Sequence, residues 1–166
     1  MRSMHLMSIL TASALALVAS GAAFAADASK LALPGDLTLT QAQKVVAATE
    51  AKAQQQGTLM NIAVIDAGGN LKAFARMDGA FLGSIDIALK KAKTARDFNM
   101  SSKELGDLAQ PGKPLYGIEV TNDGLVIFGG GELLRDKSGT IIGAVGVSGS
   151  SVEDDMGVAQ AGAAGL

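Results

Sequence analysis

The sequence predicts an α+β protein in which a five-stranded antiparallel sheet packs against helices. Two patterns support this: short apolar or alternating segments separated by turn residues, and other segments whose apolar residues recur at helical spacing. Their order along the chain is helix, two strands, helix, three strands, helix, which differs from the regular strand–helix alternation of a parallel sheet. The chain has 166 residues, 48% of them hydrophobic, and this size and composition fit one domain with a packed core.

The expected helices are recognised by their capping residues and by apolar spacing. Ser or Thr followed three residues later by Gln or Glu forms a capping box, and acidic residues are favoured in a first turn. We expect a helix that starts at Thr40, with Gln43 completing its box, and ends before Gly57; a second over 81–99; a short helical turn at Ser101 and Glu104; and a last helix capped by Ser151.

The expected strands are five, at 59–65, 71–77, 116–121, 125–134 and 140–148. In the second, Leu71, Ala73, Ala75 and Met77 alternate with Lys72, Phe74 and Arg76, so the two sets should point to opposite faces. Short turns at 66–70, 122–124 and 136–139 favour hairpins. The glycines at 129–131 match no phosphate-binding motif, which favours a bulge or close packing for them.

The N-terminus has the pattern of a secretory signal over 1–25. Arg2 supplies a basic start, residues 6–18 form an apolar run, and Ala23 and Ala25 fill the small-residue cleavage positions. We therefore expect a mature protein that starts at Ala26, lies in the periplasm or is secreted, and has no stable membrane insertion after cleavage. Residues 26–36 read as a flexible arm, and 37–166 as the domain.

Charge and composition exclude several classes of function. The chain has 14 basic and 16 acidic residues, without the basic excess that nucleic-acid binding needs. It has no cysteine, and its one histidine, His5, falls in the predicted signal. The mature chain would therefore lack the residues for Ser-His-Asp or Cys-His catalysis and for an ordinary zinc site.

Four segments together resemble the GlcG/HbpS family, whose domain also forms the C-terminal part of PduO-type proteins. They are IAVIDAGG at 62–69, FARMDGA at 74–80, ALKKAKTA at 88–95 and IGAVGVSG at 142–149. The resemblance covers 37–166 and implies a profilin-like sandwich, a homo-oligomer, and binding or degradation of haem. One departure is that Gly131 leads to Glu132, where members commonly have a Gly-Gly-x-Pro turn.

Arg76 and Asp78 are the first candidate ligand-binding residues, because they flank the end of the second strand, where the chain passes from a strand to a helix. A planar guanidinium pairs well with a carboxylate such as a haem propionate. The alternative is an Arg76–Asp78 pair that only closes the hairpin.

Lys91 is the next candidate, since it lies in the family-like segment on a helix with Lys90, Lys93 and Arg96. One of these cations can face an anionic ligand, while Lys90 and Lys93 suit a solvated surface.

Tyr116 is the candidate for ligand contact and for metal ligation, because tyrosine is a known axial ligand of haem iron and this is the only tyrosine. Methionine thioethers and hydroxyls are other available donors. The alternative for Tyr116 is an ordinary strand aromatic with its hydroxyl at the surface.

These observations predict an exported haem-binding protein with a small-molecule ligand and a homo-oligomeric state. One alternative is an enzyme that degrades haem or acts on a small carboxylate, for which Asp66, Asp78 or Asp155 would be the acid–base groups. Another is a structural partner of an exported assembly that has no small ligand.

Overall fold

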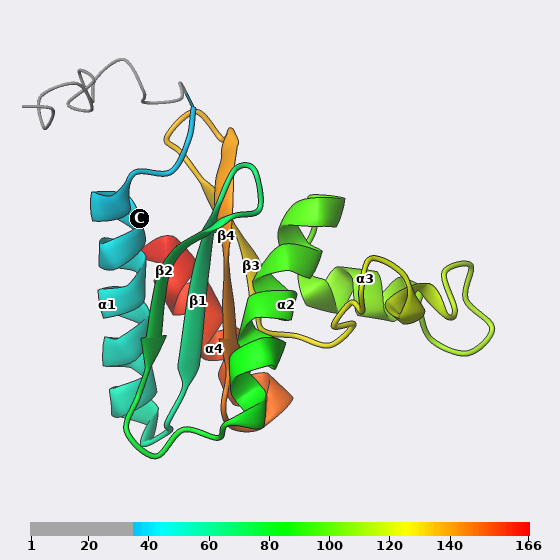
Figure 1. The fold of residues 1–166 in the computed structure, drawn as a ribbon, viewed down its shortest axis with the longest axis horizontal. Helices are drawn as coiled ribbons and strands as arrows, with labels where there is room; N and C mark the ends of the chain where they lie inside the picture. Colours follow the sequence, from blue (N-terminus) through cyan, green and yellow to red (C-terminus); the bar gives the residue numbers. More distant parts are fainter. Residues whose placement is uncertain (1–34) are drawn as a thin grey trace, which may run out of the picture. The chain divides into compact units, whose positions relative to one another are not determined.

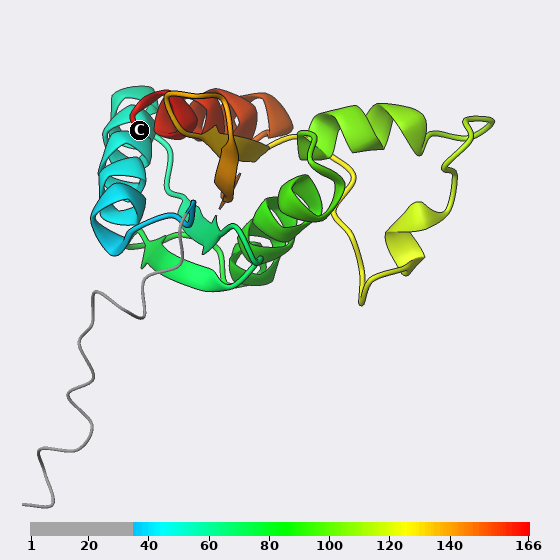
Figure 2. The same cartoon turned by 90° about the horizontal axis from the view of Figure 1, so that it is seen from above.

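A computed structural model describes residues 35–166. The predicted signal at 1–25 and most of the predicted arm at 26–36 lie outside the described residues. The fold is α+β, with one antiparallel sheet of four strands in the order β2-β1-β4-β3. Helices α1 and α4 cover one face of this sheet and α2 covers the other (Figures 1 and 2). Among residues 35–166, no helix combines the length and hydrophobicity that a bilayer span requires.

The helices follow the predicted boundaries, with one correction. They are α1 (Leu39–Gln56), α2 (Gly83–Phe98), α3 (Ser102–Leu108) and α4 (Val152–Ala164). Ser101 and Ser151 cap α3 and α4 as predicted. The capping box of α1, however, is formed by Thr38 and Gln41 instead of Thr40 and Gln43. Leu37 is fully buried just before the helix, and this anchor sets the point at which the chain turns into it.

The strands are β1 (Asn61–Asp66), β2 (Leu71–Arg76), β3 (Gly131–Arg135) and β4 (Ile141–Ser148). Each neighbouring pair is antiparallel, so two of the three expected hairpins, β1–β2 and β3–β4, are confirmed. The hairpin expected at the 122–124 turn is not formed, because β3 begins only at Gly131. The alternation predicted for the second strand holds from Ala73 to Met77. The alternation fails at Lys72, because the β1–β2 register shifts between Val64 and Ile65. The Lys72 ammonium instead forms an ion pair with Asp36, just before α1.

The prediction of five strands is wrong, since residues 116–121 do not form a strand. Gly117 has a φ of 89°, Ile118–Val120 form one turn of 3₁₀ helix (η2), and Thr121 Oγ1 donates to the Ile118 carbonyl. Without a neighbouring strand, the β-branched side chain of Val120 is 82% exposed. The whole segment 109–124 forms an excursion that extends away from the sheet beyond α3 (Figure 1).

Two hydrophobic clusters hold the layers together. The larger lies between the sheet and the pair α1 and α4, and the smaller lies between the sheet and α2. In the smaller, α2 approaches β4 so closely that a Cβ on Gly146 would collide with the backbone of Ala88 and Ala92. This close contact holds α2 against the sheet. The start of α2 therefore lies over one end of the sheet, which is the end at which β1 begins and β2 and β4 finish.

Candidate functional site

Arg76 and Asp78 lie at this end of the sheet, where β2 leads into α2. Arg76 is opposite Asn61 in β1, and Asn61 is opposite Ser148 in β4, so the three side chains share the face that α2 covers. Arg76 and Asp78 are both exposed. No ion pair within residues 35–166 includes either of them, so the alternative of an Arg76–Asp78 pair closing the hairpin is not formed.

Asn61 holds the connection between β2 and α2 in place. Its Nδ2 donates to the Phe81 carbonyl at 2.9 Å, while its Oδ1 is buried and has no hydrogen-bond partner among residues 35–166. This bond brings Phe81 to the same face as Arg76 and leaves the phenyl ring 67% exposed. Asn61 was not among the predicted site residues; the signal that could have revealed it is a polar residue within the apolar segment 59–65.

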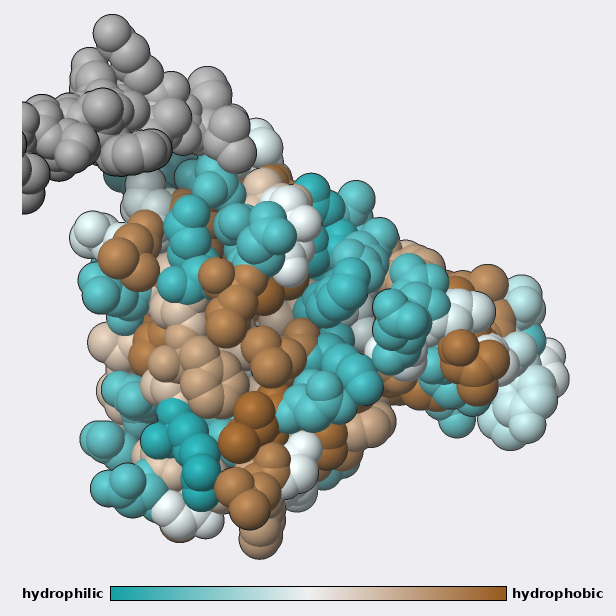
Figure 3. Space-filling model, in the orientation of Figure 1, coloured by the Kyte–Doolittle hydropathy of each residue, from teal (hydrophilic) through white to brown (hydrophobic). Residues whose placement is uncertain are grey.

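Exposed apolar side chains lie on β2 and on the connection from β2 to α2. Phe74 lies two residues earlier on the same face of β2, and Phe81 and Leu82 precede α2; all three are exposed. Figure 3 shows hydrophobic surface over the lower part of β2 and the start of α2. A guanidinium without an acidic partner among residues 35–166, on the same strand face as the exposed Phe74, matches the chemistry of a flat apolar ligand that carries a carboxylate.

A cavity of about 370 Å³ opens at the same end of the molecule. Three connections meet around it, and they contribute residues 57–59, Gly79 with Phe81, and 149–151. The volume is at the low end of the range of about 300–1,000 Å³ that is usual for small-molecule sites. A cavity of this volume is too small to enclose a large planar ligand completely.

Lys91 is in the interior, where it forms a buried ion pair. Its Nζ lies 2.6 Å from Asp155 Oδ2, donates to the Val147 carbonyl at 2.9 Å, and sits 4.9 Å from the centre of the Phe128 ring. The side chain is 0% exposed. Asp155 Oδ1 accepts from the backbone N–H groups of Gly149 and Ser150, each at 3.1 Å. The pair thus joins α2, β4 and α4 to the loop that lines the cavity.

The environment of this pair has opposing effects on its two pKa values. Burial raises the pKa of the Asp155 carboxyl and lowers the pKa of the Lys91 ammonium, and the charge of each partner opposes the shift. The short contact and the two N–H groups on Asp155 stabilise the ionised form. In this arrangement the ammonium already has its carboxylate, so contact with a ligand would require Asp155 to be displaced.

The glycines at 129–131 pack closely against the same pair. A Cβ on Gly130 would lie 2.7 Å from the Val147 carbonyl oxygen and 2.8 Å from Lys91 Nζ, and Gly130 has a φ of 115°. A Cβ on Gly131 would collide with the Lys91 carbonyl. The structure is consistent with the close-packing role expected for these glycines.

Tyr116 lies on the excursion at 109–124 and is 67% exposed. This segment and the end of β2 are on opposite sides of the molecule in Figure 1. Of the four sequence-predicted site residues, the structure therefore brings together Arg76 and Asp78, places Lys91 in the core, and leaves Tyr116 apart from the others. Whether each of them binds a ligand stays a prediction.

The carboxylates considered for an enzymatic role are mostly engaged in structure. Asp66 Oδ1 accepts from the N–H groups of Gly68 and Asn70, both at 2.9 Å, and so organises the β1–β2 turn. Asp155 belongs to the buried pair. Within the described part of the chain, no three His, Cys, Asp or Glu residues are grouped as metal ligands would be.

The fold and this end of the sheet define a class: a small α+β protein whose exposed cation and apolar surface suit an anionic, largely apolar ligand. Residues 37–164 match the family described as "Haem degrading protein HbpS-like", and the chain belongs to this family. The predicted membership of the GlcG/HbpS family is confirmed.

Individual relatives agree with this assignment. The chain is 44% identical over 119 residues to an uncharacterised 15.0 kDa protein of Citrobacter freundii, covering 72% of this chain and 84% of the relative. It is 39% identical over 133 residues to the corrinoid adenosyltransferase PduO of Salmonella typhimurium, covering 80% of this chain but only 39% of PduO.

Two solved structures are similar in fold and sequence. A structure described as a PduOC:Heme complex superimposes with a TM-score of 0.75 and 38% identity, covering 79% of this chain and 95% of the other. The structure of HbpS superimposes with a TM-score of 0.73 and 31% identity, covering 86% and 98%.

Proposed function

We propose that this protein is an exported haem-binding protein, and that haem lies on the surface formed by the end of β2 and the start of α2. The observation that carries the proposal is the exposed Arg76 guanidinium, which has no acidic partner within the described residues and shares its face of β2 with Phe74, at the sheet end where Asn61 holds the backbone of Phe81. Haem combines a flat apolar macrocycle with two propionates, so it needs both kinds of contact. The similarity to the PduOC:Heme complex and to HbpS supports the choice of ligand.

Arg76 would bind a propionate, and the exposed rings would pack against the macrocycle. A hydrogen bond to a charged group contributes about 1.5–3 kcal/mol, so losing it weakens binding by roughly tenfold to a hundredfold. Because Arg76 is exposed, we expect a loss near the lower end of that range.

Titration of the purified protein with haemin, followed through the Soret band, tests this proposal. Arg76→Ala should weaken binding about tenfold. Arg135→Ala is the matched control, because Arg135 is exposed on the opposite edge strand, where Nη1 donates to the Gly139 carbonyl. Lys90→Ala is a second control, since Lys90 is paired with Asp86 on the α2 surface. Equal weakening by Arg76→Ala and the controls, or none at all, would refute this placement.

Tyr116→Phe tests whether Tyr116 is the axial ligand of the haem iron. The distance of this segment from Arg76 within one chain leads us to expect an unchanged ferric haem spectrum in this variant. A changed spectrum with retained binding would instead make Tyr116 the axial ligand, supplied to a site other than the one proposed.

Degradation of haem is the alternative that the family description favours. Adding a reductant under oxygen to the haem-loaded protein distinguishes the two functions. A stable Soret band supports binding alone, and loss of the band faster than in a protein-free control supports degradation.

Export is the remaining part of the proposal, and it depends on the signal pattern at 1–25. Intact-mass analysis of the protein recovered from the culture medium or periplasm should give a chain that starts at Ala26. A chain that retains Met1 would contradict export by cleavage of this signal.

A further inference from the structure

Helix α2 begins without a capping side chain. Leu82 occupies the N-cap position with helical backbone angles, a φ of −61° and a ψ of −43°, and its side chain makes no capping bond. Among residues 35–166, the backbone N–H groups of Leu82 and Gly83 have no hydrogen-bond acceptor. Both residues are exposed. The positive end of this 16-residue helix is therefore open to an anion.

Two buried hydroxyl groups lie at the same end of the sheet. Ser84, the second residue of α2, is 8% exposed, and Ser148, the last residue of β4, is 4% exposed. Neither hydroxyl has a hydrogen-bond partner among residues 35–166, although buried hydroxyls usually have one. Because the Cα–Cβ bonds of a helix tilt toward its N-terminus, the Ser84 side chain leans toward the open N–H groups. An unpaired buried donor aimed at this helix end indicates a ligand there.

Asn61 lies between this helix end and Arg76. The Phe81 carbonyl accepts from Asn61 Nδ2 at 2.9 Å and from the Ser84 N–H at 3.2 Å, so the amide lies directly against the first turn. In its two ladders, Asn61 is opposite Arg76 and Ser148. The Cβ atoms of residues paired in this way are about 4.5–5.5 Å apart. One residue therefore separates Arg76 from the start of α2.

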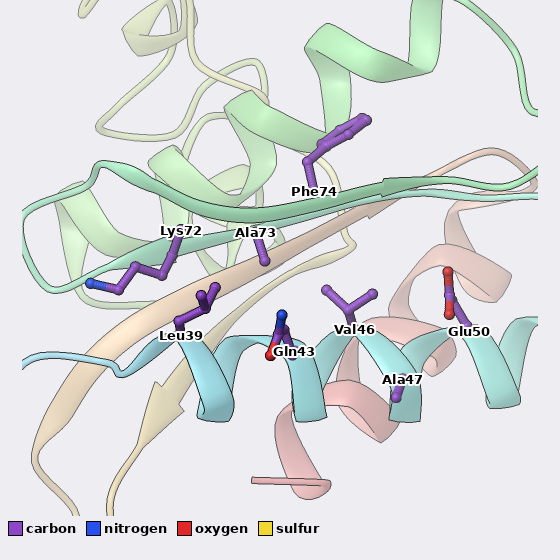
Figure 4. A pocket seen from close by; sticks show the side chains of 8 residues that line it. All are labelled: Leu39, Gln43, Val46, Ala47, Glu50, Lys72, Ala73 and Phe74. Carbon is purple, nitrogen blue, oxygen red and sulfur yellow. The ribbon is translucent and has the colours of Figure 1, made fainter.

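Arg76 lies on the side of the sheet that faces α2. Figure 4 shows that Ala73 points from β2 toward α1, whereas Phe74 points to the opposite side. Side chains alternate along a strand, so Arg76 shares the side of Phe74. The guanidinium and the start of α2 therefore present positive charge on the same side of the sheet, one a full charge and one a partial charge.

The two carboxylates nearest to Leu82 in sequence do not cap α2. Asp86 is ion-paired with Lys90, at 2.9 Å, one turn further along the helix. Asp78 is exposed, and its carboxylate has no ion pair among residues 35–166. The donors at the start of α2 are thus available to a carboxylate from outside the described part of the chain.

We propose that the start of α2 binds a carboxylate group, which accepts hydrogen bonds from the Leu82 and Gly83 N–H groups and from the Ser84 hydroxyl. Helix N-termini bind carboxylates in this way because their N–H groups and their dipole act together. The carboxylate has two candidate sources. One is a small free carboxylate, and the other is the second propionate of haem, which leaves the same edge of the macrocycle as the propionate at Arg76. The second source rests on the proposed haem binding, and the first does not.

Propanoate and the haem-free protein test the carboxylate site by itself. In amide-correlated NMR spectra, the Leu82 and Ser84 amide signals should shift with propanoate until they saturate. Propanamide, which has a similar shape but no charge, should cause no such shift. Ser84→Ala removes one donor to a charged group and should weaken propanoate binding about tenfold.

Gly83→Asp is the sharpest variant, since it places a carboxylate of the chain beside the same donors. A Cβ at this position meets no atom within 4 Å, and an acidic residue is favoured in a first turn, so the variant should unfold at or above the wild-type temperature. It should nevertheless bind propanoate about tenfold more weakly or worse. Gly83→Ala is the matched control and should bind propanoate as wild type does.

Haemin and its dimethyl ester, in which both propionates are blocked, identify the source. If a haem propionate binds at α2, Gly83→Asp should weaken haemin binding about tenfold and leave binding of the ester unchanged. Propanoate binding with an unchanged haemin affinity assigns the site to a small free carboxylate. Failure of wild type to bind haemin refutes the proposed haem binding alone. Propanoate shifts that do not saturate, that propanamide reproduces, or that Gly83→Asp retains would overturn the carboxylate site.

Discussion

The buried pair of Lys91 and Asp155 makes a quantitative prediction about stability. Asp155→Ala leaves the Lys91 ammonium, which is 0% exposed, with the Val147 carbonyl as its one hydrogen-bond acceptor among the described residues. It also removes the acceptor of the Gly149 and Ser150 N–H groups. Removing one partner of a buried ion pair costs about 3–5 kcal/mol. Lys91→Met should cost less, because the Asp155 carboxylate keeps its two backbone donors and methionine fills much of the same space.

Denaturant unfolding of wild type, both single variants and the double variant measures the coupling. The double variant leaves no unpaired charge, so its loss should be smaller than the sum of the single losses by about 0.5–3 kcal/mol. The unfolding slope should stay constant, which checks that the comparison is between the same two states. Additive losses, or a loss below about 1 kcal/mol for Asp155→Ala, would show that the pair does not hold these elements together.

Two further variants test other parts of the fold. Burial and the nearby Glu104 raise the pKa of Glu132, so ionisation of this carboxyl opposes folding. Glu132→Gln should therefore raise the melting temperature at pH 7. It should have no effect well below pH 4.5, where the carboxyl is protonated in both the folded and the unfolded state. An equal effect at both pH values would exclude this cause. Gly146→Ala should cost about 1–3 kcal/mol in unfolding free energy because of the collision with Ala88, while Gly83→Ala, where space is open, should be neutral; equal effects would contradict the close packing of α2 on β4.

Local sequence signals predicted the elements whose boundaries depend on neighbouring residues. Ser101 and Ser151 were identified as helix caps because a cap bonds to a backbone group only a few residues away. The β1–β2 hairpin was predicted from its Asp-Ala-Gly-Gly-Asn turn for the same reason. The α1 cap was placed two residues late, because the burial of Leu37 depends on the core and is not visible in the local pattern.

The segment 116–121 was predicted as a strand because its composition suits one. A strand also needs a neighbour that accepts its hydrogen bonds, and in the described structure none lies beside this segment. Its backbone therefore bonds locally, in turns and one 3₁₀ turn. Strand propensity is a local property, whereas strand pairing is a tertiary one.

The sequence by itself determined the α+β class, the antiparallel hairpins, the family, and the absence of cysteine and of histidine beyond His5. Only the tertiary structure decided which candidate residues are near each other. Arg76 faces solvent at a sheet end, Lys91 is enclosed by Asp155, and Tyr116 projects on a separate segment. The physical reason is that the sequence sets the charge and type of a side chain, whereas its burial and its partner depend on contacts between residues far apart in the chain. Lys91 and Asp155, for example, are separated by 64 positions.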